Sequence, residues 1–335
     1  MTIRIAVNGP GRIGRSIVRA IYEENFSDIE LVAINSSAPL DTLKHLLRYD
    51  SVHGKFNHKV EVQNDKLFID GKEILLCNQR DPKKLPWREM KIDLVFECTG
   101  AFTSLEDASQ HIEAGAKKVI ISAPAKESNV KTIVYGVNDD HLKESDQVIS
   151  IGSCTTNCLA PIAKILNDSI GIEKGFMTTI HAYTNDQNIV DNAHKDLRRA
   201  RACAMSMIPT STGAAKAIGL VLPELKDKLD GVAIRVPTPN VSMVDLNFIA
   251  KRNTSSQEVN SIVTNSLNGN MRRVLQYVNE PLVSIDFNHN QFSSCFDATQ
   301  TKVIGENLVK VCSWYDNEWA FSVRMLDVAR LMINK

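Results

Sequence analysis

Short apolar runs alternate with amphipathic stretches along the first half of the chain. The runs read IRIAVN, ELVAIN, DLVFECTG and KKVIISAP, and RSIVRAIYEE after the first of them has helical spacing. Alternating strand and helix signals favour a parallel sheet whose strands are joined by crossover helices. We therefore predict a doubly wound α/β domain over residues 1–152.

The pattern changes beyond residue 152. GFMTTIHAYT predicts one long strand, and in VSMVDLNFIAKR apolar residues alternate with Asp245 and Asn247. A strand with one apolar and one polar side is typical of an antiparallel sheet. We expect an α+β domain with a mixed or antiparallel sheet over residues 153–317. In the last segment, Phe321, Met325, Val328 and Met332 form the stripe of a helix.

Composition excludes several classes of protein. The 39 basic and 39 acidic residues cancel, which argues against nucleic acid or an anionic membrane as the main partner. No apolar run approaches the roughly 20 residues that cross a bilayer. The first residues enter a predicted strand at once and leave no room for a signal peptide. Seven scattered cysteines, an odd number, indicate a reducing, cytoplasmic setting.

A glycine-rich turn follows the first strand. VNGPGRIGR places Gly9, Gly11 and Gly14 in G-x-G-x-x-G spacing between a strand and a helix, which is typical of Rossmann-type dinucleotide binding. The first glycine allows the turn, the second lets the backbone approach a pyrophosphate, and the third lets helix pack on strand. The N–H groups of Arg12 and Ile13 would face the anion. A purely structural turn is the alternative.

The stretch SIGSCTTNCLAP contains two candidate thiols. If a helix begins after Cys154, its free N–H groups and positive dipole end lower the pKa of that thiol and activate it for attack. Cys158, one turn later, fits a small buried hydrophobe, and Pro161 should kink the helix. A zinc site would need a second pair of ligands at close spacing, and none of the eight histidines supplies one, so we predict no metal.

Other candidate groups lie in the second half. His181, on the predicted apolar strand, is the best partner for Cys154, although it could be an ordinary strand histidine. Arg199 and Arg235 could bind phosphate oxygens, and Thr212 and Gly213 open a predicted helix that could hold an anion. The basic run HKDLRRARA could instead be a solvated face.

Several motifs together resemble phosphorylating glyceraldehyde-3-phosphate dehydrogenases of the bacterial type. They are SCTTNC, HAYTNDQ, HKDLRRAR, PTSTGAAKA, IRVPTPNVSMVDL and WYDNEWAFS, and the resemblance extends from Ile3 to the C-terminal helix. It implies that Cys154 attacks the aldehyde, that His181 takes the proton, and that phosphate cleaves a thioester. The implied partners are glyceraldehyde 3-phosphate and inorganic phosphate.

The resemblance also implies binding residues and assembly. Asn317 would hold the nicotinamide carboxamide, and Thr99 and Ser122 would line the cofactor groove. The helix over residues 318–335 would return to the first domain. A homotetramer is implied, with the stretch from Tyr183 to Ile208 reaching a neighbouring subunit. The residues implied for the two phosphate sites are Ser153, Thr155, Thr184, Arg199, Thr212, Gly213 and Arg235.

Two departures from the family pattern concern the cofactor. Pro10 replaces the usual phenylalanine of the glycine turn, which stiffens the turn. Ser36 stands where members specific for NAD usually have aspartate, whose charge would repel a 2′-phosphate. Asn192 and Ala193 replace the usual Leu-Pro, and Arg80 could add a positive partner. We therefore expect NADP to be used, alone or with NAD; the alternative is that Ser36 serves NAD through a neutral hydrogen bond.

Two rival functions remain open on the sequence. Erythrose-4-phosphate dehydrogenase shares the cysteine and histidine motifs, but Thr212 and Gly213 in PTSTGAAKA favour an enzyme that uses inorganic phosphate. A role in nucleic-acid binding or adhesion belongs to a different class, and the zero net charge argues against it as the main function.

Overall fold

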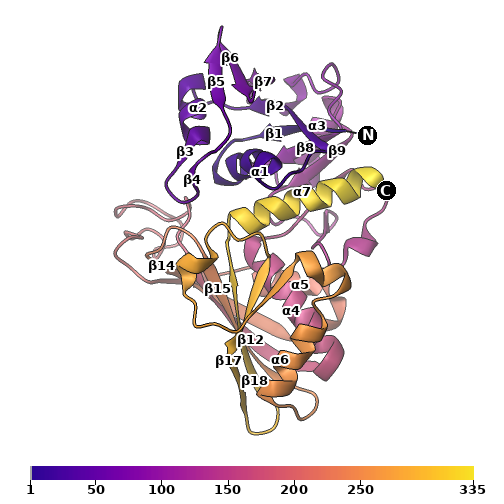
Figure 1. Ribbon diagram of the computed structural model, residues 1–335, viewed down its shortest axis with the longest axis vertical. Helices are drawn as coiled ribbons and strands as arrows, with labels where there is room; N and C mark the ends of the chain where they lie inside the picture. Colours follow the sequence, from indigo (N-terminus) through magenta and orange to yellow (C-terminus); the bar gives the residue numbers. More distant parts are fainter. Residues whose placement is uncertain (1) are drawn as a thin grey trace. The chain divides into compact units, whose positions relative to one another are not determined.

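The computed structural model describes residues 2–335, which form two compact units. The first comprises residues 2–133, 139–153 and 321–335, and the second comprises residues 134–138 and 154–320 (Figure 1). Among the described residues, no helix is both long and apolar enough to cross a membrane.

A nine-stranded sheet forms the centre of the first unit, in the order β10-β11-β9-β8-β1-β2-β7-β6-β5. Its strands are β1 (Ile3–Asn8), β2 (Ile29–Asn35), β5 (Val60–Gln63), β6 (Lys66–Ile69), β7 (Lys72–Cys77), β8 (Leu94–Glu97), β9 (Lys118–Ile121), β10 (Lys131–Thr132) and β11 (Val148–Ser150). The helices are α1 (Arg12–Glu23), α2 (Leu40–Arg48) and α3 (Leu105–Glu113), and β3 (Tyr49–Asp50) pairs with β4 (Gly54–Lys55).

The parallel core of this sheet confirms the predicted doubly wound domain. β1 pairs in parallel with β2 and β8, and Ile5, Ala6 and Val7 in its middle are fully buried, as expected of a strand covered on both faces. The edge differs from the prediction, because β5, β6 and β7 form an antiparallel meander. Its strands are only four to six residues long and give no crossover-helix signal.

A seven-stranded mixed sheet forms the second unit, in the order β13-β14-β12-β15-β18-β17-β16. Its strands are β12 (Ile172–Ala182), β13 (Ile208–Ser211), β14 (Leu229–Val236), β15 (Ser242–Ala250), β16 (Leu275–Val278), β17 (Ser294–Ile304) and β18 (Leu308–Tyr315). The helices α4 (Cys154–Ile170), α5 (Ala214–Val221) and α6 (Ser256–Asn265) lie on one side of it (Figure 1). β12 is parallel to β14 and antiparallel to β15, so the predicted mixed sheet is confirmed.

The core of the second unit lies between this sheet and its helices. Val244, Leu246 and Phe248 alternate along β15 and pack into the same cluster as residues of α4, α5 and α6. Pro161 lies inside α4, which nevertheless continues as one helix to Ile170. Cys158 is fully buried in this cluster, in agreement with its reading as a small hydrophobe.

The last helix, α7 (Trp319–Asn334), belongs to the first unit from Phe321 onward. Arg330 donates to Asp28 at 2.9 Å and its guanidinium lies 4.1 Å from the centre of the Phe26 ring. The four residues of the predicted stripe are buried, but so are Ser322 and Arg324. The helix is therefore buried well beyond the single stripe that the sequence predicts.

Candidate active site

The predicted cofactor residues of the first unit follow the ends of neighbouring strands. Gly9 follows β1, Ser36 follows β2, Thr99 comes two residues after β8, and Ser122 follows β9. Because these strands are parallel, their carboxyl ends lie at one edge of the sheet, where open α/β sheets bind nucleotides. Arg80 is exposed in the segment after β7.

Two of the three glycines in the turn are closely packed. Gly9 has a φ of +87°, and a Cβ there would lie 2.7 Å from Thr99 Cγ2. A Cβ on Gly14 would lie 2.4 Å from the Gly9 carbonyl oxygen, so α1 packs directly on the turn. By contrast, a Cβ on Gly11 would meet nothing within 4 Å, and this residue, the N-cap of α1, makes no side-chain cap. The open space beside an uncapped helix start fits a bound anion.

The side chains around this turn are held by other contacts. The Arg12 guanidinium pairs with Asp50 at 2.5 Å, so this side chain is engaged within the first unit. Arg15 donates to the Pro10 carbonyl oxygen at 2.8 Å, so Pro10 still contributes an acceptor to the turn.

Ser36 borders a cavity of about 320 Å³ next to α2 and β7. Its Oγ accepts the backbone N–H of Ala38 at 3.0 Å. Asp65, in the turn between β5 and β6, lines the same cavity. A carboxylate is thus absent at position 36 itself, but one stands elsewhere on the cavity wall.

In the second unit, the structure brings Cys154 and His181 together. Cys154 is the first residue of α4 and His181 is near the end of β12, and the distance from Sγ to Nε2 is 3.5 Å. His181 pairs in register with Arg235 on the neighbouring strand β14, so their side chains are adjacent. Tyr315 lies edge-on to the His181 ring and hydrogen-bonds Thr155 at 2.9 Å and Thr179 at 2.8 Å.

The electrostatics of this pair differ from the sequence expectation. Burial raises the pKa of the Cys154 thiol, although the charge of Arg235 and the N–H of Thr155 oppose that rise. Burial and then the Arg235 charge lower the pKa of His181 to about 3. The expected lowering of the thiol pKa by the helix start is therefore wrong for this geometry, because desolvation outweighs it.

Arg235 limits which nitrogen of His181 carries the proton. Nδ1 lies 2.6 Å from Arg235 Nη1 and 2.7 Å from the Ala182 carbonyl oxygen. When Nδ1–H donates to Ala182, Nε2 is free to accept the thiol proton. When Arg235 donates to Nδ1, the proton is on Nε2 instead. Arg235 Nη1 also reaches the Ala182 oxygen at 3.0 Å, so a small movement of Arg235 selects between the two forms.

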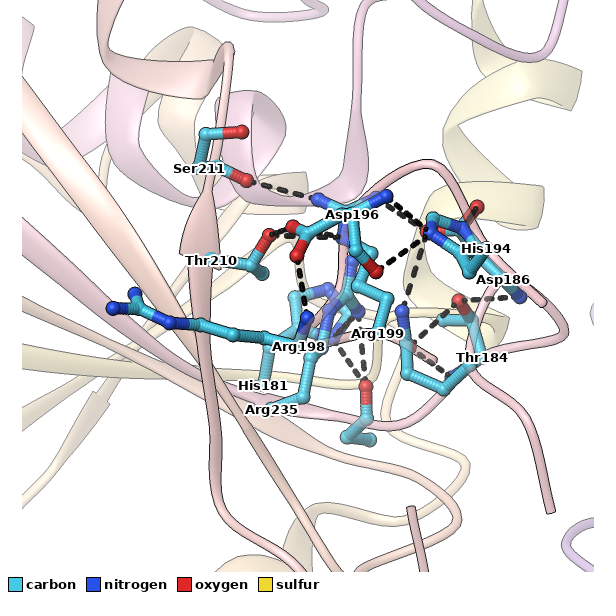
Figure 2. Close-up of polar contacts among 12 residues, drawn as sticks. His181, Thr184, Asp186, His194, Asp196, Arg198, Arg199, Thr210, Ser211 and Arg235 are labelled. Carbon is cyan, nitrogen blue, oxygen red and sulfur yellow. Dashed lines mark hydrogen bonds and ion pairs between the residues drawn. The ribbon is translucent and has the colours of Figure 1, made fainter. Parts of the chain in front are cut away.

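Arg199 is already paired with acidic groups (Figure 2). Its guanidinium contacts Asp186, donates from Nε to Thr210 Oγ1 at 2.9 Å, and donates to the Ser211 carbonyl oxygen at 3.1 Å. Burial opposes ionisation of Asp186, but the Arg199 charge lowers the pKa of that carboxyl overall. Asp186 is not among the residues predicted from the sequence, although the carboxylate in HAYTNDQ is the signal for it. An anion at Arg199 must compete with this carboxylate.

Arg235 is the better-placed cation for an anionic ligand. Its Nε is a buried donor without a hydrogen-bond acceptor among the described residues. A buried donor left unpaired is unfavourable, so a ligand oxygen at this point would be stabilised.

The remaining predicted residues lie at ends of elements. Thr184 follows β12 and its N–H donates to Gln187 at 3.0 Å. Thr212 Oγ1 accepts from Ala214 N–H at 3.2 Å, and Gly213 is the N-cap of α5. Ser153 directly precedes α4, and Asn317 Oδ1 accepts from Ser242 Oγ at 2.9 Å.

Comparison with known proteins assigns the family. The model described as "Glyceraldehyde 3-phosphate dehydrogenase, NAD binding domain" matches residues 3–105, and the corresponding C-terminal domain matches residues 153–317. The chain belongs to the glyceraldehyde-3-phosphate dehydrogenase family.

Family members from bacteria match nearly its whole length. The chain is 56% identical to the glyceraldehyde-3-phosphate dehydrogenase of Xanthobacter flavus over 99% of each chain. It is 53% identical to that of Geobacillus stearothermophilus over 100% of this chain and 99% of the relative.

Proposed function

We propose that the chain oxidises and phosphorylates D-glyceraldehyde 3-phosphate to 1,3-bisphosphoglycerate with NAD(P). The observation that carries this proposal is the cluster of Cys154, His181 and Arg235, which places a nucleophile, a base and an unpaired cationic donor together. The names of the curated relatives support the same activity.

In the first step, the Cys154 sulfur bonds to the aldehyde carbon and its proton passes to His181 Nε2. The new proton makes His181 cationic, and Nδ1–H then donates to the Ala182 carbonyl oxygen, 2.7 Å away. The protonated imidazole then transfers its proton to the former aldehyde oxygen, which gives a neutral thiohemiacetal on Cys154 and a neutral His181. A positioned base of this kind typically contributes about 10²- to 10⁴-fold to the rate.

In the second step, His181 takes back the hydroxyl proton while a hydride leaves the same carbon, which gives a thioester on Cys154. The nicotinamide cofactor, when bound, supplies the acceptor for that hydride. An oxygen of inorganic phosphate then attacks the thioester carbon, the carbon–sulfur bond breaks, and an acyl phosphate leaves. The sulfur departs as a thiolate, which Arg235 stabilises by its charge.

Phosphate groups would bind around Arg235, with Ser153, Thr155, Thr184, Arg199, Thr212 and Gly213 as the remaining predicted contacts. The unpaired Nε of Arg235 supports phosphate binding by that residue. Arg199 is paired with Asp186, so a phosphate there would have to share the guanidinium with that carboxylate or displace it. Ser242 fixes the oxygen of Asn317, so its amide nitrogen would face a ligand carbonyl. The cofactor would be held by Gly9, Gly11, Arg12, Ile13, Gly14, Ser36, Arg80, Thr99 and Ser122.

The proposal includes a homotetramer in the cytoplasm. The family resemblance supports the tetramer, and the absence of paired cysteines in the described chain is compatible with a reducing compartment.

Steady-state kinetics with glyceraldehyde 3-phosphate test the function. We expect turnover with NAD or NADP only when inorganic phosphate or its analogue arsenate is present, and no turnover by Cys154→Ser. The serine hydroxyl is not ionised at neutral pH, so it cannot replace the thiol. Turnover that needs no phosphate, or a higher kcat/KM for erythrose 4-phosphate, would contradict the proposal.

A further inference from the structure

A buried carboxylate lies at the end of β8, next to the glycine turn. Glu97 is 1% exposed. Its Oε2 accepts from Asn8 Nδ2 at 2.5 Å and from His111 Nε2 at 3.0 Å. Its Oε1 accepts the Thr99 N–H at 2.8 Å and the Thr99 hydroxyl. A carboxylate in the interior requires hydrogen bonds in place of water, and these donors provide them.

Trp87 fixes the direction of these hydrogen bonds. Its indole nitrogen can only donate, and it lies 3.0 Å from His111 Nδ1. Nδ1 therefore accepts, and neutral His111 carries its proton on Nε2, toward Glu97. Asn8 Nδ2 lies 3.4 Å from His111 Nε2, and both are donors, so they meet only through the Glu97 oxygen that they share.

This cluster connects directly to the glycine turn. Asn8 is the residue before Gly9, and its Oδ1 accepts from Asn35 at the end of β2 at 2.7 Å. Thr99 is the residue against which a Cβ on Gly9 would collide. Glu97 thus holds the neighbours of Gly9 on both sides and links the ends of β1, β2 and β8.

We propose that Glu97 is a positioning residue for the dinucleotide. Its carboxylate holds Asn8 and Thr99 against Gly9, so that the turn and the start of α1 keep the arrangement that accepts a pyrophosphate. The proposal rests on the proposed function, in which this edge of the sheet binds NAD(P). Glu97 does not touch the cofactor itself; it acts through the backbone of the turn.

Glu97→Gln tests the proposal. An amide has one acceptor oxygen, so its NH₂ group must face donors, either Asn8 and His111 or the Thr99 N–H. We expect the Kd of the purified apoenzyme for NAD and NADP, measured by calorimetry, to rise at least about tenfold. The KM for the cofactor should rise by a similar factor, while kcat stays within about twofold of the wild-type value. This pattern indicates that binding is weakened equally in the ground state and the transition state. The rate of Cys154 alkylation should stay unchanged, because the second unit is not altered.

A matched control distinguishes a loss of cofactor affinity caused by a misplaced turn from one caused by lower stability of the unit. Ile92→Ala removes a buried side chain from the core of the same unit, just before the start of β8, whereas Glu97 is at the end of that strand. It should lower Tm but leave the cofactor Kd at the wild-type value. The proposal is overturned if Glu97→Gln binds cofactor within about twofold of wild type, or if Ile92→Ala weakens binding equally.

A second variant is decisive if Glu97→Gln does not fold. Thr99→Val keeps the branched side chain beside Gly9 and removes the hydroxyl, which donates to Glu97 and accepts the N–H of Ala101 at 3.1 Å. We expect its cofactor Kd to rise about threefold, and an unchanged Kd overturns the proposal. A wild-type protein that binds neither NAD nor NADP would instead refute the proposed function.

Discussion

Arg235 influences both reacting groups at once. Its charge opposes the rise that burial causes in the pKa of Cys154, and it adds to the lowering that burial causes in the pKa of His181. Its register position beside His181 on β14 explains this double effect, because adjacent strands bring the two side chains to one face. A ligand phosphate at the unpaired Nε would partly neutralise the same charge.

We therefore predict that Arg235→Gln moves two pKa values upward. Without the cation, the thiolate of Cys154 loses stabilisation, so its pKa rises further above the ordinary value. Alkylation requires the thiolate and increases as pH rises through that pKa, so the profile should shift to higher pH. The pKa of His181, followed by NMR, should rise as well. An alkylation profile that stays in place would show that Arg235 does not act on the thiol.

The residue at position 36 should decide cofactor choice. Ser36→Asp would restore a carboxylate that accepts from a ribose hydroxyl and repels a 2′-phosphate. We expect the ratio of kcat/KM values to shift toward NAD by about 1–3 kcal/mol, the value of a charged hydrogen bond. If wild-type kcat/KM for NAD already exceeds that for NADP by more than about a hundredfold, the expected use of NADP is wrong.

Asp65 provides a control for that substitution. It lines the cavity beside Ser36, so its charge can act on a 2′-phosphate from a different side. Asp65→Asn should shift the same ratio toward NADP, opposite to Ser36→Asp, when measured in the same assay. An effect in the same direction would mean that the substitutions act through the fold and not through charge.

At the scale of elements, two glycines of the turn should differ in their effects on stability and on cofactor binding. Gly11→Ala places a methyl group where nothing lies within 4 Å, whereas Gly14→Ala places it 2.4 Å from the Gly9 carbonyl oxygen. We expect Gly11→Ala to keep the wild-type Tm and lose cofactor affinity, because the methyl occupies the space of the pyrophosphate. Gly14→Ala should lose affinity and also about 1–3 kcal/mol of stability. Calorimetry measures the cofactor affinity and thermal unfolding measures Tm. If the two variants lost equal amounts of Tm, the expected difference between Gly11 and Gly14 would be wrong.

Elements with a regular period could be predicted from the sequence. The period-two alternation of β15 predicted which of its residues enter the core, and the apolar runs predicted the parallel strands. The meander β5–β7 could not be predicted, because a short exposed edge is specified by its turns and partners. Asp65 in one of these turns has a φ of +59°, which no apolar pattern reveals.

The candidate site shows the same limit. Motif position was enough to select Cys154 and His181 as a pair, whose atoms lie 3.5 Å apart. It could not predict that burial would raise the pKa of the thiol, because desolvation depends on neighbours distant in the chain. Asp186 and Glu97 were missed for a related reason. A carboxylate gains its role from the donors around it, and spacing in the sequence does not show them.

At the scale of the whole molecule, the segment between Tyr183 and Ile208 exposes an unusual amount of apolar surface. Leu197 is 83% exposed and Met205 is 87% exposed, and Ile189, Val190 and Met207 are also open to solvent. Large exposed apolar side chains concentrated in one segment are typical of interaction sites, and the family resemblance makes a second copy of the chain the expected partner.

We therefore predict a tetramer in solution whose assembly depends on this segment. Burial of one large apolar side chain contributes about 1.5–3 kcal/mol, and a charge in its place forfeits that amount in every subunit. Leu197→Glu combined with Met205→Glu should shift the mass measured by light scattering to dimers or monomers at micromolar concentration. Ile304→Glu, at an exposed residue at the end of β17, is the control and should leave the mass unchanged. A double variant that stays tetrameric would place the subunit contacts on another surface.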